Sequence, residues 1–136
     1  TATAKIKFRP NPSSKGERCG MGVIGMDYSA LSLQQVGGEF ILSQVLCKKA
    51  EDGAEETIVE SVKTGTNELY LRVTVRNIKE CTFSYSTDGK NFKTLGTPFI
   101  AREGLWIGSK VGLFCTRSSW KNDGGWMDVD WFSIKK

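Results

Sequence analysis

Apolar and polar side chains alternate with a period of two along most of this chain, and this alternation restricts the fold more than any other feature of the sequence. The segment "LYLRVTV" (69–75) shows it most clearly. Successive side chains of a strand point to opposite faces, so the segment should have an apolar face of Leu69, Leu71, Val73 and Val75 and a polar face of Tyr70, Arg72 and Thr74. No window keeps the i, i+3, i+4, i+7 spacing of an amphipathic helix for more than a turn or two. The sequence therefore predicts an all-β protein.

Turn signals divide this pattern into short strands. Gly37-Gly38 separates "SALSLQQV" from "EFILSQVLC", and Asp88-Gly89 follows "CTFSYS"; both pairs suit the positive backbone dihedrals of hairpin turns. The charged segment 48–56 is interpreted as a loop, and "KVGLFCT" and "WMDVDWFSI" are expected to be the last two strands. Many short strands separated by glycine-containing turns predict an antiparallel two-sheet β-sandwich or jelly roll. We expect residues 1–136 to form a single domain.

Composition excludes several functions. The net charge of +4 is spread without a Lys/Arg run, which disfavours nucleic acid as a partner. No stretch approaches the ~18 apolar residues of a membrane span. The absence of histidine removes Ser-His-Asp and Cys-His nucleophiles and imidazole-containing zinc sites. The chain begins "TATAK", without a Met or a signal peptide, and is expected to be a piece of a longer protein.

Four cysteines are spaced widely, and none forms a C-x-x-C pair, which disfavours a zinc knuckle. Each lies in an apolar stretch. Buried free thiols are the favoured interpretation, and a disulfide is the alternative.

The tryptophan-rich segment "SSWKNDGGWMDVDWF" (118–132) is the main candidate for a binding site. The C–H face of a pyranose packs on an aromatic plane, and its hydroxyls need polar partners. Trp120 and Trp126 provide aromatic planes, and Asn122 and Asp123 provide polar groups in the same turn. Trp131 is expected in the core.

Other candidates lie elsewhere in the chain. Trp106 belongs to a different connection, and its exposure is left open. Tyr70 and Arg72 on the polar strand face either line a sugar site or form an ordinary solvated face. Gln44 is either a ligand residue or an interior side chain that satisfies a backbone group.

Four segments together resemble the C-terminal concanavalin A-like β-sandwich of glycoside hydrolase family 43 enzymes, the β-xylosidases and arabinofuranosidases of xylan breakdown. They are "GMGVIGMDYSALSL", "FILSQVLCKKAEDG", "FSYSTDGKNFKTLGTPFIAREGLWIGSKVGLFCTR" and "DGGWMDVDWF". The resemblance covers almost the whole chain, although the family domain normally has further strands before the one resembling "TATAKIKF".

The resemblance implies a jelly-roll module attached to a five-bladed propeller. In some members this module binds xylan and is classed as a carbohydrate-binding module of family 91. It also implies that Asp130 matches a structural calcium ligand, although its partners would come from upstream strands, and that no cofactor is required. The alternative, which is favoured over calcium, is that Asp130 makes a hydrogen bond or an ion pair within the sandwich. The parent enzyme would be secreted, periplasmic or at the cell surface.

Three functions follow from these observations. The preferred one is a noncatalytic module that binds xylan or xylo-oligosaccharides weakly. The alternative is a purely structural module that packs on the propeller and shapes its active-site mouth. Catalysis by the domain itself would need a carboxylate pair in a cleft, for which Asp123, Asp128 and Asp130 are the candidates. The resemblance instead places the catalytic carboxylates in the propeller.

Overall fold

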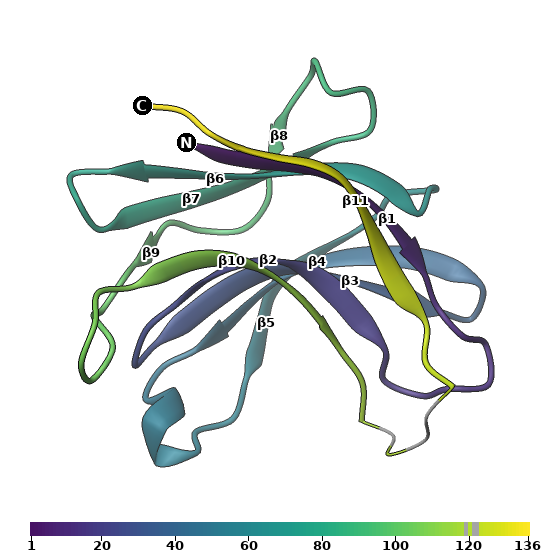
Figure 1. Ribbon diagram of the computed structural model, residues 1–136, viewed down its shortest axis with the longest axis horizontal. Helices are drawn as coiled ribbons and strands as arrows, with labels where there is room; N and C mark the ends of the chain where they lie inside the picture. The colour runs from purple at the N-terminus through teal and green to yellow at the C-terminus, as the bar shows by residue number, and fades with distance from the viewer. Residues whose placement is uncertain (119, 121–122) are drawn as a thin grey trace.

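The protein folds into two antiparallel β-sheets that face each other in two layers, as a computed structural model of residues 1–118, 120 and 123–136 shows (Figure 1). Sheet A has the order β11-β1-β6-β7-β8, with β9 also paired to β7, and sheet B has the order β10-β2-β3-β4-β5. The strands are β1 (Ala2–Arg9), β2 (Arg18–Ile24), β3 (Tyr28–Val36), β4 (Glu39–Cys47), β5 (Thr57–Lys63), β6 (Glu68–Arg76), β7 (Glu80–Ser86), β8 (Lys93–Thr94), β9 (Phe99–Ile100), β10 (Lys110–Thr116) and β11 (Trp126–Ile134). The predicted two-sheet sandwich is confirmed.

The core lies between the sheets and is built from the inward faces of the alternating strands. Leu69, Leu71 and Val73 are fully buried, as predicted. Val75 is 40% exposed, so its assignment to the core was wrong. The reason is that β1 begins at Ala2, opposite Val73, so this antiparallel neighbour does not extend to Val75.

The two predicted turns are confirmed. Gly37 and Gly38 join β3 to β4 with φ of 58° and 81°. Gly89, with φ of 74°, lies in the β7–β8 connection, where the Asp88 carboxylate accepts hydrogen bonds from the Lys90 and Asn91 amides at 2.8 Å each. The 48–56 loop contains one short 3₁₀ helix, η1 (Ala50–Asp52). The edge strand β5 and the short β9 were not predicted.

Strand β11 contains a β-bulge that reverses the expected orientation of Trp131. Ile6 pairs with Val129, whereas its neighbour Lys5 pairs with Trp131, so Asp130 is an extra residue. A shift of one residue moves every later side chain to the opposite face. Trp131 therefore lies on the outer face of sheet A and is 41% exposed, and its predicted place in the core was wrong.

The inward side chains of the last strand, β11, are more exposed to solvent than those of the central strands. The side chains of Val129, Phe132 and Ile134 face inward, because they pair with the buried Ile6, Ala4 and Ala2. Even so, each of the three is exposed. They form an open apolar edge of sheet A.

All four cysteines are free thiols. Cys19, Cys47 and Cys81 are buried, whereas Cys115 is exposed, which corrects the expectation that all four are buried. Burial raises the pKa of the Cys19 thiol. Cys19 and Cys115 are direct partners across β2 and β10.

A polar cluster of Arg18, Tyr28 and Glu56 joins β2 and β3 of sheet B to the connection that precedes β5. Arg18 makes two hydrogen bonds to the Glu56 carboxylate, one of them at 3.1 Å from Nη2 to Oε2. The Tyr28 hydroxyl donates a third at 2.8 Å. Burial acts to raise the pKa of Glu56, but the hydrogen bonds from Arg18 and Tyr28 and the Arg18 charge outweigh it, so the pKa is lowered.

No helix in the described part of the chain has the length and apolar character needed to cross a membrane.

Candidate carbohydrate-binding face

The outer face of sheet A brings together three aromatic side chains from β6 and β11. Lys5 pairs with Trp131 on one side and with Tyr70 on the other, so all three side chains point outward. The rings of Tyr70 and Trp131 come from the two strands that flank β1; their centroids are 6.1 Å apart and their planes are tilted by 54°. Trp126 starts β11 opposite Arg9 and is 57% exposed. We call Tyr70, Trp126 and Trp131 the aromatic face.

A shallow hollow of about 410 Å³ lies beside the bulge, on the β11 segment between the two tryptophans. Its polar lining consists of Lys5, Lys7, Glu68, Asp128 and Asp130. This lining offers both hydrogen-bond donors and carboxylate acceptors at the surface.

Ion pairs hold the acidic groups of this hollow in place. Arg9 Nε lies 2.5 Å from Asp128 Oδ2, and Lys5 Nζ lies 3.0 Å from Asp130 Oδ2. Asp128 also accepts a hydrogen bond of 3.1 Å from Nε1 of Trp126. The hydrogen bond from Arg9 is the main cause that lowers the pKa of Asp128. The carboxylate is therefore ionised at neutral pH and helps to orient Trp126.

The β7–β8 connection packs against Tyr70, the β6 residue of the aromatic face. Gly89 packs so closely on Tyr70 that a Cβ at this position would lie 2.8 Å from Cζ of the ring. Arg72 stacks on Phe92, with Cζ 3.4 Å from the ring centroid, and donates a hydrogen bond of 3.0 Å to Thr3 Oγ1. Tyr70 thus lies between the Gly89 turn and Trp131 in a fixed position.

The predicted Trp120–Trp126 platform lies partly outside the described residues. Trp120 is fully exposed, as predicted, but Asn122 is not among the residues that the structure describes. The Asp123 carbonyl accepts a hydrogen bond of 2.8 Å from Asn11 Nδ2, which ties its loop to the segment after β1. These contacts do not test the sugar contact that the sequence predicted for Trp120, Asn122 and Asp123.

Trp106 belongs to a different surface. It is 91% exposed in the β9–β10 connection, whereas Trp120 follows the opposite end of β10 (Figure 1). The structure therefore does not bring Trp106 and Trp120 together.

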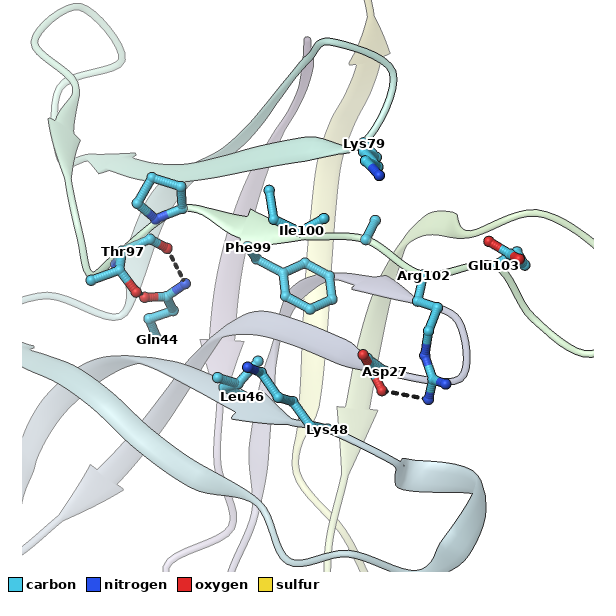
Figure 2. Close-up of a pocket in the computed structure, with 12 residues that line it drawn as sticks. Asp27, Gln44, Leu46, Lys48, Lys79, Thr97, Phe99, Ile100, Arg102 and Glu103 are labelled. Atoms are coloured by element: carbon cyan, nitrogen blue, oxygen red, sulfur yellow. Dashed lines mark hydrogen bonds and ion pairs between the residues drawn. The ribbon is translucent and has the colours of Figure 1, made fainter.

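Gln44 faces the interior, where protein atoms occupy its amide. It is 1% exposed. Its Nε2 donates to the Thr97 carbonyl at 2.8 Å, and its Oε1 accepts from the Thr97 amide at 2.7 Å (Figure 2). This geometry supports the interior alternative, because Gln44 fixes the segment between β8 and β9 to sheet B.

Comparison with known proteins identifies the family of this chain. Residues 1–135 match the family described as the β-xylosidase C-terminal concanavalin A-like domain. The chain belongs to this family. A β-xylosidase from Formosa agariphila is 45% identical over 69 residues, which is 49% of this chain and 11% of the relative.

Solved structures of larger proteins contain the same fold. A bifunctional GH43-CE protein from Bacteroides eggerthii has a TM-score of 0.77 at 22% identity, over 98% of this chain and 17% of that chain. An engineered GH43 enzyme with endo-xylanase and exo-arabinofuranosidase activity has a TM-score of 0.70 at 19% identity, over 96% of this chain and 28% of that chain. The chain thus spans only a small part of each protein, and the predicted resemblance to family 43 is confirmed.

The calcium site that the resemblance implied at Asp130 finds no carboxylate partners among the residues described in this β-xylosidase C-terminal domain. Calcium takes six to eight oxygen ligands. In the part of the chain that the structure describes, no group of three or more His, Cys, Asp or Glu residues comes together. The Asp130 carboxylate instead pairs with Lys5. A metal ion here would need oxygen ligands other than these.

Ion pairs engage both acidic residues of β11 that were candidates for a catalytic pair. A glycosidase needs one carboxyl with a raised pKa to protonate the leaving group. Asp128 has a lowered pKa, and both Asp128 and Asp130 are paired with cations.

Sequence reasoning missed Trp131 of the aromatic face and Lys5 and Glu68 of the hollow beside it. Trp131 was assigned to the core because it stands next to Phe132 in the final strand, and tryptophan near the end of a sandwich often fills the core. Lys5 lies on β1, whose outward residues were not considered, and Glu68 begins β6 one position before the alternating segment 69–75. The alternation of "TATAKIKF" was visible and would have placed Lys5 outward.

Proposed function

We propose that this domain is a noncatalytic accessory module that binds xylan or xylo-oligosaccharides weakly on the outer face of sheet A. The observation that carries the proposal is the position of Trp126 and Trp131 on either side of a hollow lined by charged groups. The family assignment to a β-xylosidase domain supports a xylose-containing ligand.

The spacing of the two tryptophans suits an extended chain. Trp126 lies opposite Arg9 and Trp131 opposite Lys5, four positions apart on β1, which at ~3.3 Å per residue is roughly 13 Å. A short oligosaccharide laid along β11 would place one ring on Trp126 and another near Trp131 and Tyr70. Hydroxyls between them would reach Asp128, Asp130, Lys5 and Glu68.

The fixed positions of these groups favour binding without rearrangement. Ion pairs hold the carboxylates, and Gly89 and Trp131 hold Tyr70. A surface in place before binding avoids the cost of ordering side chains. A shallow exposed site still excludes little water, so we expect a Kd on the order of 10 µM to 1 mM.

A noncatalytic role agrees with the lowered pKa of Asp128 and with the cation partners of both β11 acids. We therefore expect no release of xylose or arabinose from aryl glycosides by this domain alone.

A second function, packing against the catalytic propeller of a parent enzyme, is favoured by exposed apolar groups elsewhere on the domain. Leu105, Trp106 and Ile107 form an apolar run in the β9–β10 connection, and all three are exposed. The open apolar edge of β11 adds Val129, Phe132 and Ile134. Large exposed apolar patches mark interaction surfaces. Such packing is compatible with sugar binding on the outer face of sheet A.

The test is calorimetry of the domain with xylohexaose, with affinity electrophoresis on xylan as a second assay. Trp131→Ala should weaken binding at least tenfold, because it removes the stacking surface beside Tyr70. Trp106→Ala is the matched control, since it also removes an exposed indole, and it should leave binding unchanged. Equal binding by the wild type and Trp131→Ala would contradict the proposed site.

A further inference from the structure

Two cysteines, Cys19 on β2 and Cys115 on β10, lie directly opposite each other on neighbouring strands of sheet B. The register of β10 on β2 has no irregularity along its length. Directly opposite residues of an antiparallel pair have Cα atoms about 4.5 or about 5.5 Å apart, and disulfides join Cα atoms about 4.4 to 6.8 Å apart. The backbone therefore already has the spacing that a disulfide needs.

Both thiols lie on the inner face of sheet B. Cys19 is fully buried in the core. Val111 and Leu113 of β10 pack against this core, and Cys115 follows them on the same face because successive side chains of a strand alternate. Burial, and in addition the charge of Cys115, raises the pKa of the Cys19 thiol, so the two sulfur groups are near enough to interact. They are therefore placed to form a bond without a change of strand register.

The other two cysteines lie opposite residues of other types in the described strands. Cys47 pairs with Tyr28 across β3 and β4. Cys81 pairs with Val75 on one side and with Phe99 on the other. The strand register thus selects one of the cysteine pairs that the sequence allows.

One thiol of the selected pair can be reached from solvent. Cys115 lies near the end of the edge strand β10 and is exposed. A small hollow of about 140 Å³ opens beside it, and the rest of its lining is Glu17, Thr116, Arg117 and Gly125. A reagent can therefore react first at Cys115, and the buried Cys19 can then complete the bond from the inside.

We propose that Cys19 and Cys115 form a reversible disulfide that fastens the edge strand β10 to β2 when a small-molecule disulfide, such as glutathione disulfide, is the oxidant. The Cys115 thiolate attacks one sulfur of glutathione disulfide, forms a mixed disulfide and releases one glutathione thiolate. The Cys19 thiolate then attacks the Cys115 sulfur and releases the second glutathione thiolate. The protein loses two electrons and two protons, and the two glutathione molecules gain them.

The bond would hold the strand that leads into the tryptophan-rich segment, since β10 ends at Thr116. A cross-link between positions 19 and 115 closes a long loop and restricts the unfolded chain. We therefore expect the oxidised domain to melt at least about 5 °C above the reduced domain. The proposal does not depend on sugar binding.

The test is exchange of the purified domain with glutathione disulfide, followed by denaturation, alkylation of the remaining thiols and mass spectrometry. Exchange is carried out at about pH 8.5, because the thiolate is the nucleophile and burial, together with the charge of Glu17, raises the pKa of Cys115. Two of the four free thiols should be lost, and no glutathione should remain attached. Peptide mapping should link Cys19 to Cys115, and dithiothreitol should restore all four thiols.

Single variants separate the two steps of the exchange. Cys19→Ala should stop the reaction half-way, with glutathione retained on Cys115. Cys115→Ser should form no intramolecular disulfide. Cys81→Ala is the matched control, because it removes a thiol that is also buried but has no cysteine opposite it, and it should still form the Cys19–Cys115 bond.

The proposal is overturned if all four thiols of the wild type can still be alkylated after exchange, or if the disulfide links any other pair of cysteines. A dimer joined through Cys115, or a mixed disulfide that persists on Cys115 in the wild type, also overturns it. A Cys19–Cys115 disulfide that leaves the melting temperature unchanged overturns its role in fastening β10.

Discussion

Strands β6 and β11 have the same alternating sequence pattern but use it differently. In β6 the alternation is unbroken, so Leu69, Leu71 and Val73 are fully buried and Tyr70 faces outward. In β11 the bulge at Asp130 reverses the alternation half-way, so Trp131 faces outward with Tyr70. Met127 packs against the core before the bulge, whereas the inward Val129, Phe132 and Ile134 remain 40% to 72% exposed.

The alternating pattern of a strand is not enough to tell whether a side chain is buried. Alternation indicates which residues share a face of a strand. It does not indicate whether a second layer covers that face, or whether the register shifts within the strand. A central strand such as β6 has neighbours on both sides, whereas β11 pairs only with β1 among the described strands.

The largest effect expected from this comparison concerns stability. Leu71→Ala should lower the free energy of unfolding by about 2 to 5 kcal/mol, because it leaves a cavity in a fully buried site. Val129→Ala, an inward but exposed residue, should cost less than about 1 kcal/mol. Urea denaturation of both variants measures the difference. Similar losses would show that the edge of β11 is packed as tightly as the middle of the sandwich.

The second prediction concerns the contribution of Glu56 to the free energy of unfolding. We expect it to be smaller than that of Leu71 and to be lost at acidic pH. Its folded-state pKa is lowered, so its contribution is present above its unfolded pKa of about 4.3 and is lost as the pH falls through the folded value. Glu56→Gln should cost about 1 to 2 kcal/mol at pH 7, since the partly buried Arg18 loses a charged partner.

The check for Glu56 is the difference in unfolding free energy between wild type and Glu56→Gln at several pH values. This difference should shrink as the pH falls from about 5 towards 3. A difference that is constant over this range would contradict the role given to the Glu56 carboxylate.

The smallest effect is expected at the bulge. The Lys5–Asp130 pair is exposed, with 61% of the Asp130 side chain accessible, so Asp130→Asn should change stability by less than about 1 kcal/mol. Thermal unfolding with added calcium and with a chelator provides the control. A melting temperature that rises with calcium in the wild type and not in Asp130→Asn would instead identify Asp130 as a metal ligand.

Much of the fold could be predicted from sequence because local signals agree with it. The alternation in β1 to β4, β6 and β7 and the glycines at 37, 38 and 89 define the strands and turns without tertiary information. The short β9 has no periodic signal, because it has only two residues.

The candidate site was predictable only in part. Tyr70 and Arg72 were placed on the correct face because β6 is regular. Trp131 was not, because a bulge depends on pairing with β1 and leaves no local sequence signal in β11. Gln44 could not be assigned from its neighbours, since its partner Thr97 lies 53 residues away in sequence.

The central claim is that sugar contacts the outward tryptophans of β11 rather than those of the loops. The most direct test is the indole N–H spectrum of the domain, whose four tryptophan signals can be assigned with single Trp→Phe variants. On titration with xylohexaose, the signals of Trp126 and Trp131 should shift together, and those of Trp106 and Trp120 should stay in place. Shifts confined to Trp106 or Trp120, or no shift of any indole at millimolar ligand, would contradict the account.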